Sequence, residues 1–271
     1  QMLPKEIACT LFSATIPQTV KSLAREFQRP SAEFLSLSYD KVIANNLTHR
    51  YYCCDVMEKD SLTVKILEWE NPSSCMIFCN MKRDVSYLEQ VLTNHGFNVA
   101  ALSGDVAQKL REKTLENFRK QKINILICTD VAARGIDVSH VTHVIVYDHP
   151  EDKEVYVHRS GRTARAGKEG VAISLITPVE EIELQKTAAD FGIQFEKMPP
   201  ITDEMLTNRL QERLLDSLER EKRNIRPLDK ARLERFIPLV EKMTKDQDQK
   251  ETLAMLLDQY LKKQKGNHGK N

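Results

Sequence analysis

The sequence predicts an α/β fold, a parallel sheet with helices on both faces, followed by an all-α helical extension. Short apolar runs alternate with helical patterns between residues 45 and 198, and such alternation is typical of βαβ units. Pro199 and Pro200 then interrupt the chain. Beyond them leucines recur at every fourth residue without any strand pattern, which predicts helices.

The elements of the α/β part follow from the spacing of apolar residues. Short apolar runs predict strands at residues 49–55, 75–79, 99–102, 123–128, 143–147 and 171–176. Helical spacing predicts helices at residues 61–70, 83–95, 109–120, 153–164 and 180–191. Because a helix separates most successive strands, the sheet is expected to be largely parallel.

The first 44 residues predict a strand at 8–13, a helix at 20–27 and a strand at 34–37. This is too little sequence to bury a core of its own. We therefore expect a new unit from residue 45 to 198, a helical unit at 199–262 and a polar, disordered tail at 263–271.

Composition limits the function classes. The chain has 271 residues, 41% hydrophobic and 29% charged, with a net charge of +1, which is ordinary for a soluble globular protein with two domains. It shows no apolar run of membrane-spanning length and no signal peptide, so we expect a cytoplasmic protein. The six cysteines lack the paired spacing of a zinc site and are interpreted as reduced core thiols. Any affinity for nucleic acid must come from local clusters of Lys and Arg.

A cationic motif, His-Arg-Ser-Gly-Arg-Thr-Ala-Arg, occupies residues 158–165. Its arginines are spaced by three, and a guanidinium offers phosphate oxygens a permanently charged, planar fork of donors. If the segment opens a helix, the arginines Arg159, Arg162 and Arg165 lie on one face. The motif therefore favours a polyphosphate site. The alternative is a solvated basic face.

Polar residues follow the predicted strands where each strand ends. The apolar run at 125–128 is followed by a Thr-Asp pair, an Ala-Ala-Arg-Gly turn and a second carboxylate, and the runs ending near residues 79 and 102 show a similar change. Open α/β sheets bind ligands outside the carboxyl ends of their strands. These polar residues are therefore expected at a ligand site.

In this order, together with Ser-Ala-Thr at 13–15, the motifs resemble the carboxyl-terminal half of a DEAD-box RNA helicase of superfamily 2. The resemblance covers residues 13 to about 178. It implies that residues 1–44 are a remnant of a first RecA-like domain with its linker and that residues 45–198 are the second RecA-like domain. ATP and Mg²⁺ would be bound mainly by the first domain, because this sequence has neither a G-x-x-x-x-G-K-[ST] loop nor an Asp-Glu-Ala-Asp segment. By itself the chain is expected to be inactive as an ATPase.

The resemblance also implies roles for single residues. Arg162 and Arg165 match the catalytic arginine fingers, which contact the nucleotide together with Gly135 and Asp137. Sequence-independent contacts to the RNA backbone are implied for Asn80, Arg83, Gly104, Asp105, Thr129, Asp130 and Arg134, with Gln108 and Arg111 bracing that surface. Coupling between the domains is implied for Ser13, Thr15, His158 and Arg159. A structural role is the alternative for His158, Ser13 and Thr15. Ser103 stands where the family commonly has His.

The helical tail resembles, more weakly, the dimerisation region of bacterial cold-shock DEAD-box proteins, mainly at residues 236–240 and 251–257. This implies a homodimer, and the alternative is a monomeric extension packed on its own domain. The leading hypothesis is thus the carboxyl-terminal portion of an ATP-dependent RNA helicase with a dimerisation module. The main alternative is a stand-alone RNA-binding dimer without ATPase activity.

Overall fold

The computed structural model of the chain describes residues 10–11, 18–29, 31–33, 35, 46–104, 106–133, 136, 138–165 and 167–267. The chain divides into two compact units, residues 1–42 and 43–271. The first unit contains helix α1 (Gln18–Phe27), close to the helix predicted there. The two strands predicted on either side of it lie mostly outside the described residues.

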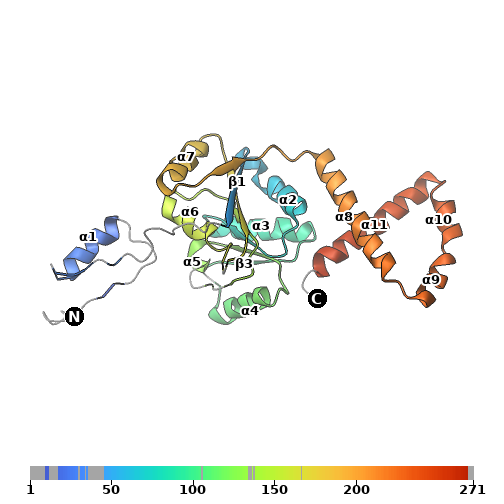
Figure 1. Cartoon of the computed structure of the whole chain (residues 1–271), viewed down its shortest axis with the longest axis horizontal. Coiled ribbons are helices and arrows are strands. Elements are labelled where there is room, and N and C mark those ends of the chain that lie inside the picture. Colours follow the sequence, from blue (N-terminus) through green and yellow to red (C-terminus); the bar gives the residue numbers. More distant parts are fainter. Residues whose placement is uncertain are drawn as a thin grey trace. The chain divides into compact units, whose positions relative to one another are not determined.

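The second unit is built on a parallel sheet with the strand order β3-β4-β2-β5-β6-β1-β7 (Figure 1). Its strands are β1 (Leu47–Cys53), β2 (Cys75–Phe78), β3 (Val99–Leu102), β4 (Ile125–Cys128), β5 (His143–Val146), β6 (Gly170–Ile176) and β7 (Phe195–Lys197). The predicted α/β class is confirmed, and only the short edge strand β7 was not predicted. It escapes the pattern because two of its three residues are charged and exposed.

Helices cover both faces of this sheet. They are α2 (Lys59–Glu70), preceded by the 3₁₀ turn η1 (Val56–Glu58), α3 (Lys82–Asn94), α4 (Gln108–Arg119), α5 (Asp130–Ala133), α6 (Lys153–Ser160) and α7 (Glu180–Phe191). Strand β2 shows the alternation across the sheet, since Ile77 packs in one core with α2 and α3, while Phe78 packs in the other with α4 and α6. Both cores therefore fix the carboxyl end of β2.

The predicted helix at 153–164 is too long. Helix α6 ends at Ser160, and the chain turns away at Gly161. The Thr163 hydroxyl, which is buried, contacts the carbonyls of Val141 (2.7 Å) and Thr142 (3.0 Å), so it ties the following turn to the segment before β5. The cationic motif thus closes a helix instead of opening one, and its arginines do not share a helical face.

The helical extension consists of α8 (Asp203–Arg223), α9 (Pro227–Glu234), α10 (Ile237–Met243) and α11 (Gln247–Asn267). The guanidinium of Arg213 donates to the carbonyls of Glu68 and Trp69, the last turn of α2, and so fastens α8 to the α/β part. The hydroxyls of Ser217 and Tyr260, 3.1 Å apart, join α8 to α11 where the two helices cross (Figure 1). Helix α11 continues to Asn267, so it extends into the segment 263–271 for which the sequence predicts a disordered tail.

Two further observations concern the described residues. None of their helices combines the length and the apolarity needed to cross a membrane. The five cysteines among them are all free thiols, and Cys75, Cys79 and Cys128 are buried, where burial raises their thiol pKa.

Candidate functional site

The carboxyl ends of β2, β4 and β5 lie side by side, and the polar residues that follow them meet there. Asn80 follows β2, Thr129 and Asp130 follow β4, and Asp148 follows β5. Parallel strands deliver their carboxyl ends to one edge of the sheet, which is where such folds bind ligands. The predicted site residues that the structure describes at these strand ends therefore share one edge.

Arg159, near the end of α6, joins these strand ends. Its Nε and Nη2 donate in parallel to the two carboxylate oxygens of Asp130, at 2.9 and 2.7 Å. Its Nη1 donates to the carbonyl of Asp148 (2.6 Å), and Nη2 also donates to Oδ1 of Asn80 (2.7 Å). The side chain is 1% exposed and lies against the Phe78 ring. With its fork so occupied, Arg159 holds the edge together and is not available as a phosphate ligand.

Asn80 is committed to the same network. Its main-chain N–H donates to Oδ2 of Asp148 (3.0 Å), and its Nδ2 donates to the carbonyl of His149 (3.0 Å). Its Oδ1 accepts the bond from Arg159. The side chain that the resemblance assigns to RNA thus also fixes the shape of the loop after β2.

Arg162 and Arg165 lie differently from Arg159. Each is half-buried, and each Nε donates back to the carbonyl four residues earlier, Arg162 to His158 (3.3 Å) and Arg165 to Gly161 (3.0 Å). Arg162 Nη1 also donates to the carbonyl of Ile136 (3.2 Å). Both side chains therefore lie along the turn after α6, with part of their surface open to solvent.

The turn that carries these two arginines has a fixed conformation. Ala164, between them, has a left-handed backbone with φ of 56° although it is not glycine. It is 7% exposed, and Thr163 beside it is 1% exposed. Buried neighbours hold a conformation that an alanine would otherwise seldom adopt. The two arginines are thus presented from a rigid base.

The remaining predicted residues are placed as follows. Arg83 is exposed and lies 3.4 Å from the carboxylate of Asp84, Gly104 is exposed after β3, and Thr129 is buried. The Nε2 atom of His158 is buried without a hydrogen-bond partner in the described part of the chain. Arg111 donates to the carbonyl of Ala132 (3.0 Å), and Gln108 donates to Glu112 (2.7 Å). Ser13, Thr15, Asp105, Arg134, Gly135 and Asp137 lie outside the described residues.

Sequence reasoning missed Asp148, which touches Asn80 and Arg159. Burial raises the pKa of its carboxyl, and the hydrogen bond from the Asn80 N–H and the charge of Lys59 oppose that rise. Burial lowers the pKa of the adjacent His149. A charged residue directly after an apolar strand, in Tyr147-Asp148-His149-Pro150, is the signal that could have identified it.

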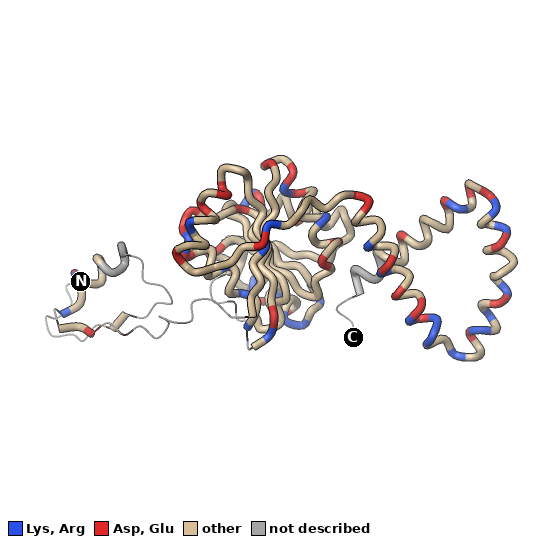
Figure 2. The backbone as a smooth tube through the Cα atoms, turned by 45° about the horizontal axis from the view of Figure 1, so that its top comes forward, with Lys and Arg blue, Asp and Glu red and all other residues tan. Residues whose placement is uncertain are grey.

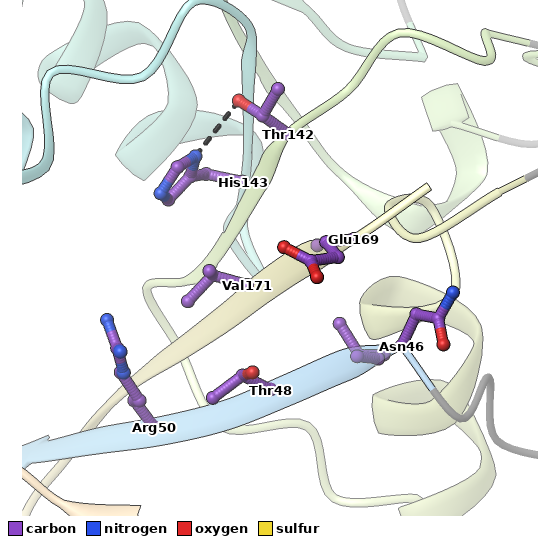
Figure 3. Close-up of a pocket in the computed structure, with 9 residues that line it drawn as sticks. Asn46, Thr48, Arg50, Thr142, His143, Glu169 and Val171 are labelled. Carbon is purple, nitrogen blue, oxygen red and sulfur yellow. Dashed lines mark hydrogen bonds between the residues drawn. The ribbon is translucent and has the colours of Figure 1, made fainter. Parts of the chain in front are cut away.

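A cavity of about 580 Å³ opens at the opposite edge, near the amino ends of β1, β5 and β6 (Figure 3). Arg50, which lines it, is paired with Glu70 (3.4 Å) and Glu196 (3.2 Å), and the ring of His143 lies 3.6 Å from Glu70. None of the predicted site residues that the structure describes lines this cavity. Its arginine, Arg50, is already paired with two carboxylates. No cluster of three or more His, Cys, Asp or Glu suited to a metal occurs among the described residues.

Comparison with known proteins agrees with this geometry. Residues 58–167 match the family described as the helicase conserved C-terminal domain. Over 212 residues the chain is 32% identical to the DEAD-box ATP-dependent RNA helicase RhpA of Helicobacter pylori, an alignment that covers 78% of this chain and 43% of RhpA. It is 33% identical to the solved E. coli DEAD-box protein SrmB, with a TM-score of 0.53, over 59% of this chain and 93% of that one. The chain belongs to the DEAD-box RNA helicase family.

Within this DEAD-box protein, the matched region contains the edge described above. The S. cerevisiae protein Dbp5, solved with RNA and ADP BeF3, is 30% identical, with a TM-score of 0.67 over 77% of this chain and 56% of Dbp5. The α/β part of the second unit is thus the carboxyl-terminal RecA-like domain of a DEAD-box protein. The chain spans less than half the length of RhpA.

Proposed function

We propose that this chain is the carboxyl-terminal portion of an ATP-dependent RNA helicase and that Arg162 and Arg165 are its arginine fingers. The observation that carries the proposal is the contrast within one motif. Arg159 is buried and fully engaged with Asp130, Asn80 and Asp148, whereas Arg162 and Arg165 are partly exposed on the turn beside it, whose backbone is left-handed at Ala164. A partly exposed cation held along a defined turn suits charge that develops on a transferred phosphoryl group.

ATP and Mg²⁺ would bind mainly to a first RecA-like domain. The bound nucleotide supplies the phosphoryl group that is transferred to water. From this side, Arg162 and Arg165 would approach its terminal phosphate when the two domains close. Removing such a finger lowers the rate by about 10³- to 10⁵-fold in related phosphoryl transferases.

RNA is proposed to lie across the carboxyl edge of the sheet and to be held through its backbone. Gly104 and Arg83 are exposed there, and Thr129 and Asp130 stand at the end of β4. Main-chain amides and cations contact phosphates without reading bases. Binding would therefore be largely independent of sequence. That Dbp5 was solved with RNA and ADP BeF3 supports both ligands.

The helical extension is proposed to form a homodimer in a cytoplasmic protein. Helices α9 and α10 contain no buried residue. The large apolar side chains of these helices and of Phe236 between them are about half exposed or more: Leu228, Leu233, Phe236, Ile237, Leu239 and Val240. Positive and negative residues are mixed along α8 to α11 (Figure 2), so burial of this apolar surface, rather than net charge, would drive association. A second copy would present the same face.

The arginine fingers are tested in a two-domain protein, in which this chain follows a RecA-like domain with a phosphate loop. Arg162→Ala and Arg165→Ala should each lower RNA-stimulated ATPase turnover by at least about 10³-fold. Arg220→Ala, at an exposed arginine of α8, is the matched control and should leave turnover unchanged. Turnover within tenfold of the parent in both finger variants would refute the assignment.

The dimer is tested by sedimentation equilibrium of this chain. Leu239→Glu should convert a dimer to a monomer, because it places a charge in the apolar face of α10. The control is Ile182→Glu, at another exposed apolar residue, in α7, which should leave the dimer intact. A monomeric parent chain would refute dimerisation.

The alternative function, a stand-alone RNA-binding dimer, is favoured by the same unpartnered helical face. It predicts that this chain binds single-stranded RNA tightly without nucleotide and without a first domain. Fluorescence anisotropy with oligo(U) distinguishes the two functions. Affinity that appears only when a first domain and ATP are present supports the helicase.

A further inference from the structure

A buried lysine lies behind the edge proposed to bind RNA, outside the motifs that the family resemblance marks. Lys59 begins α2, and its side chain is 5% exposed. Its Nζ lies 3.8 Å from Oδ1 of Asp148 and 3.6 Å from Oε2 of Glu180. Burying an ammonium is costly even when carboxylates face it, and apolar replacements of buried ion pairs are often as stable. The pair with Asp148 therefore calls for a role beyond stability.

Asp148 connects the ends of two strands through both its main chain and its side chain. The main-chain N–H groups of Tyr147 and Asp148 donate to the carbonyl of Phe78, the last residue of β2. The carboxylate Oδ2 accepts the main-chain N–H of Asn80, two residues later, at 3.0 Å. The carboxylate thus fixes the point where β2 passes into the loop that carries the predicted RNA contacts.

The same residue reaches β4 through Arg159. The carbonyl of Asp148 accepts Nη1 of Arg159 at 2.6 Å, and Arg159 holds Asp130 with two parallel hydrogen bonds. Asn80 completes a cyclic hydrogen-bond network, because its Oδ1 accepts a hydrogen bond from Arg159 while its N–H donates to Asp148. The loops after β2 and β4 are therefore held in one arrangement, with Asp148 between them.

The charge of Asp148 matters to this arrangement. A carboxylate is a stronger acceptor for a main-chain N–H than a protonated carboxyl group. Burial and Asp84 favour the neutral form, whereas Lys59, Arg159 and the Asn80 N–H favour the charged form. Lys59 differs from the Asn80 N–H and from Arg159, because it places a full positive charge 3.8 Å from the Asp148 carboxylate itself.

We propose that Asp148 is a positioning residue for RNA binding, with Lys59 as its counter-ion. It would hold the Asn80 loop and the Asp130 end of β4 in the spacing that the RNA backbone requires, without touching RNA itself. The inference rests on the proposed function, since it concerns how the loops at the proposed RNA-binding edge are held in place.

Two double variants of the two-domain protein separate positioning from stability. Lys59→Met with Asp148→Leu removes both charges and the acceptor for the Asn80 N–H. Lys59→Met with Asp148→Asn removes the same charges but keeps an acceptor of nearly the same shape. Because neither leaves an unpaired buried charge, both should fold, and their melting temperatures should differ only by the effect of one hydrogen bond. The comparison therefore isolates one hydrogen bond.

We expect the Leu variant to raise the KM for RNA in the ATPase assay about tenfold, as loss of a hydrogen bond to a charged group implies. Its kcat at saturating RNA should stay within about twofold of the Asn variant, and the salt dependence of RNA binding should be unchanged, because no phosphate contact is lost. The Asn variant keeps a weaker, neutral acceptor, so its KM should lie between those of the parent and the Leu variant. Equal KM values in the two variants would overturn the proposal.

Two other outcomes are decisive as well. If the parent protein shows no RNA-stimulated ATPase activity, the proposed function falls, and this inference falls with it. If the Leu variant does not fold, the contact is read in the ¹⁵N-labelled chain, where the Asn80 amide resonance should move with pH in the parent and stay fixed in the Asn variant. An Asn80 resonance that ignores pH would refute the carboxylate contact.

Discussion

Gly170 lies so close to Thr163 that no side chain could stand there. A Cβ at position 170 would be 2.3 Å from the Thr163 hydroxyl oxygen and 2.6 Å from the Ala164 nitrogen. Strand β6 begins at this glycine, and the turn that presents Arg162 and Arg165 rests directly on it. The contact links the start of the strand to the geometry of the proposed fingers.

Gly170→Ala should therefore displace this turn. The added methyl group must push main-chain atoms, so we expect the free energy of unfolding to fall by about 1–3 kcal/mol. In the two-domain protein, ATPase turnover should fall by more than stability explains, because both arginines move. Urea denaturation and steady-state ATPase assays measure the two effects.

The control for this prediction is Glu169→Ala, at the exposed residue before it, which should change stability by less than about 0.5 kcal/mol. A Gly170→Ala protein with parental turnover would show that the turn can shift without moving the arginines.

Arg159→Lys should be far more harmful to stability than a conservative change suggests. A lysine cannot reproduce the parallel bonds to Asp130 together with those to Asn80 and Asp148, and it leaves buried acceptors unpaired. We expect a loss of about 3 kcal/mol in the free energy of unfolding. Arg83→Lys, at an exposed arginine, should be neutral. Equal stability of the two variants in urea would contradict the structural role of Arg159.

The three arginines of the cationic motif differ in burial and in hydrogen-bond partners, and the sequence alone did not predict this difference. Their equal spacing predicted one cationic face, yet Arg159 is buried because its partners Asp130 and Asn80 arrive from distant strands. Spacing within a motif carries no information about such partners. The sequence pattern also does not predict Gly170. Glycine is needed there because the turn at Thr163 and Ala164 packs against it, and not because its own backbone dihedral angles require glycine.

The sheet itself was more predictable. Strands β2, β3 and β4 are wholly apolar and could be predicted directly, because buried parallel strands are continuous apolar runs. Strand β7 was not predicted because edge pairing with β1, and not burial, makes it a strand. The position of α8 depends on Arg213, a residue that any sequence pattern would assign to a solvated helix face.

Arg213→Gln should loosen the attachment of α8 to α2. The guanidinium satisfies the carbonyls of Glu68 and Trp69 at the end of α2, and a shorter neutral side chain cannot reach both. We expect a loss of about 1–2 kcal/mol in stability and faster amide exchange in α8. Arg223→Gln, exposed at the far end of α8, should change neither. Unaltered exchange in the Arg213 variant would mean that the packing of Leu206, the Lys65–Asp203 pair and the Arg209–Trp69 contact hold α8 without it.

Stability should fall in mild acid because of His49. This ring is buried, its Nδ1 lies 2.7 Å from the Tyr156 hydroxyl, and burial lowers its pKa to about 4. In the unfolded chain His49 has a pKa of about 6.5, so it is protonated below that pH, whereas in the native chain it stays neutral until about pH 4. Stability is therefore lost as pH falls through this window, by about 2 kcal/mol between pH 7 and 5 from His49 alone.

Urea denaturation at pH 7 and 5 checks this value. His49→Gln cannot take up the proton, so its loss of stability between the two pH values should be smaller than that of the parent by about 2 kcal/mol. His95→Gln, at an exposed histidine, should keep the full parental loss. Burial also lowers the pKa of His140 and His149, so some pH dependence remains in both variants. If His49→Gln and the parent lost equal stability, the ring of His49 would have to be protonated inside the folded domain.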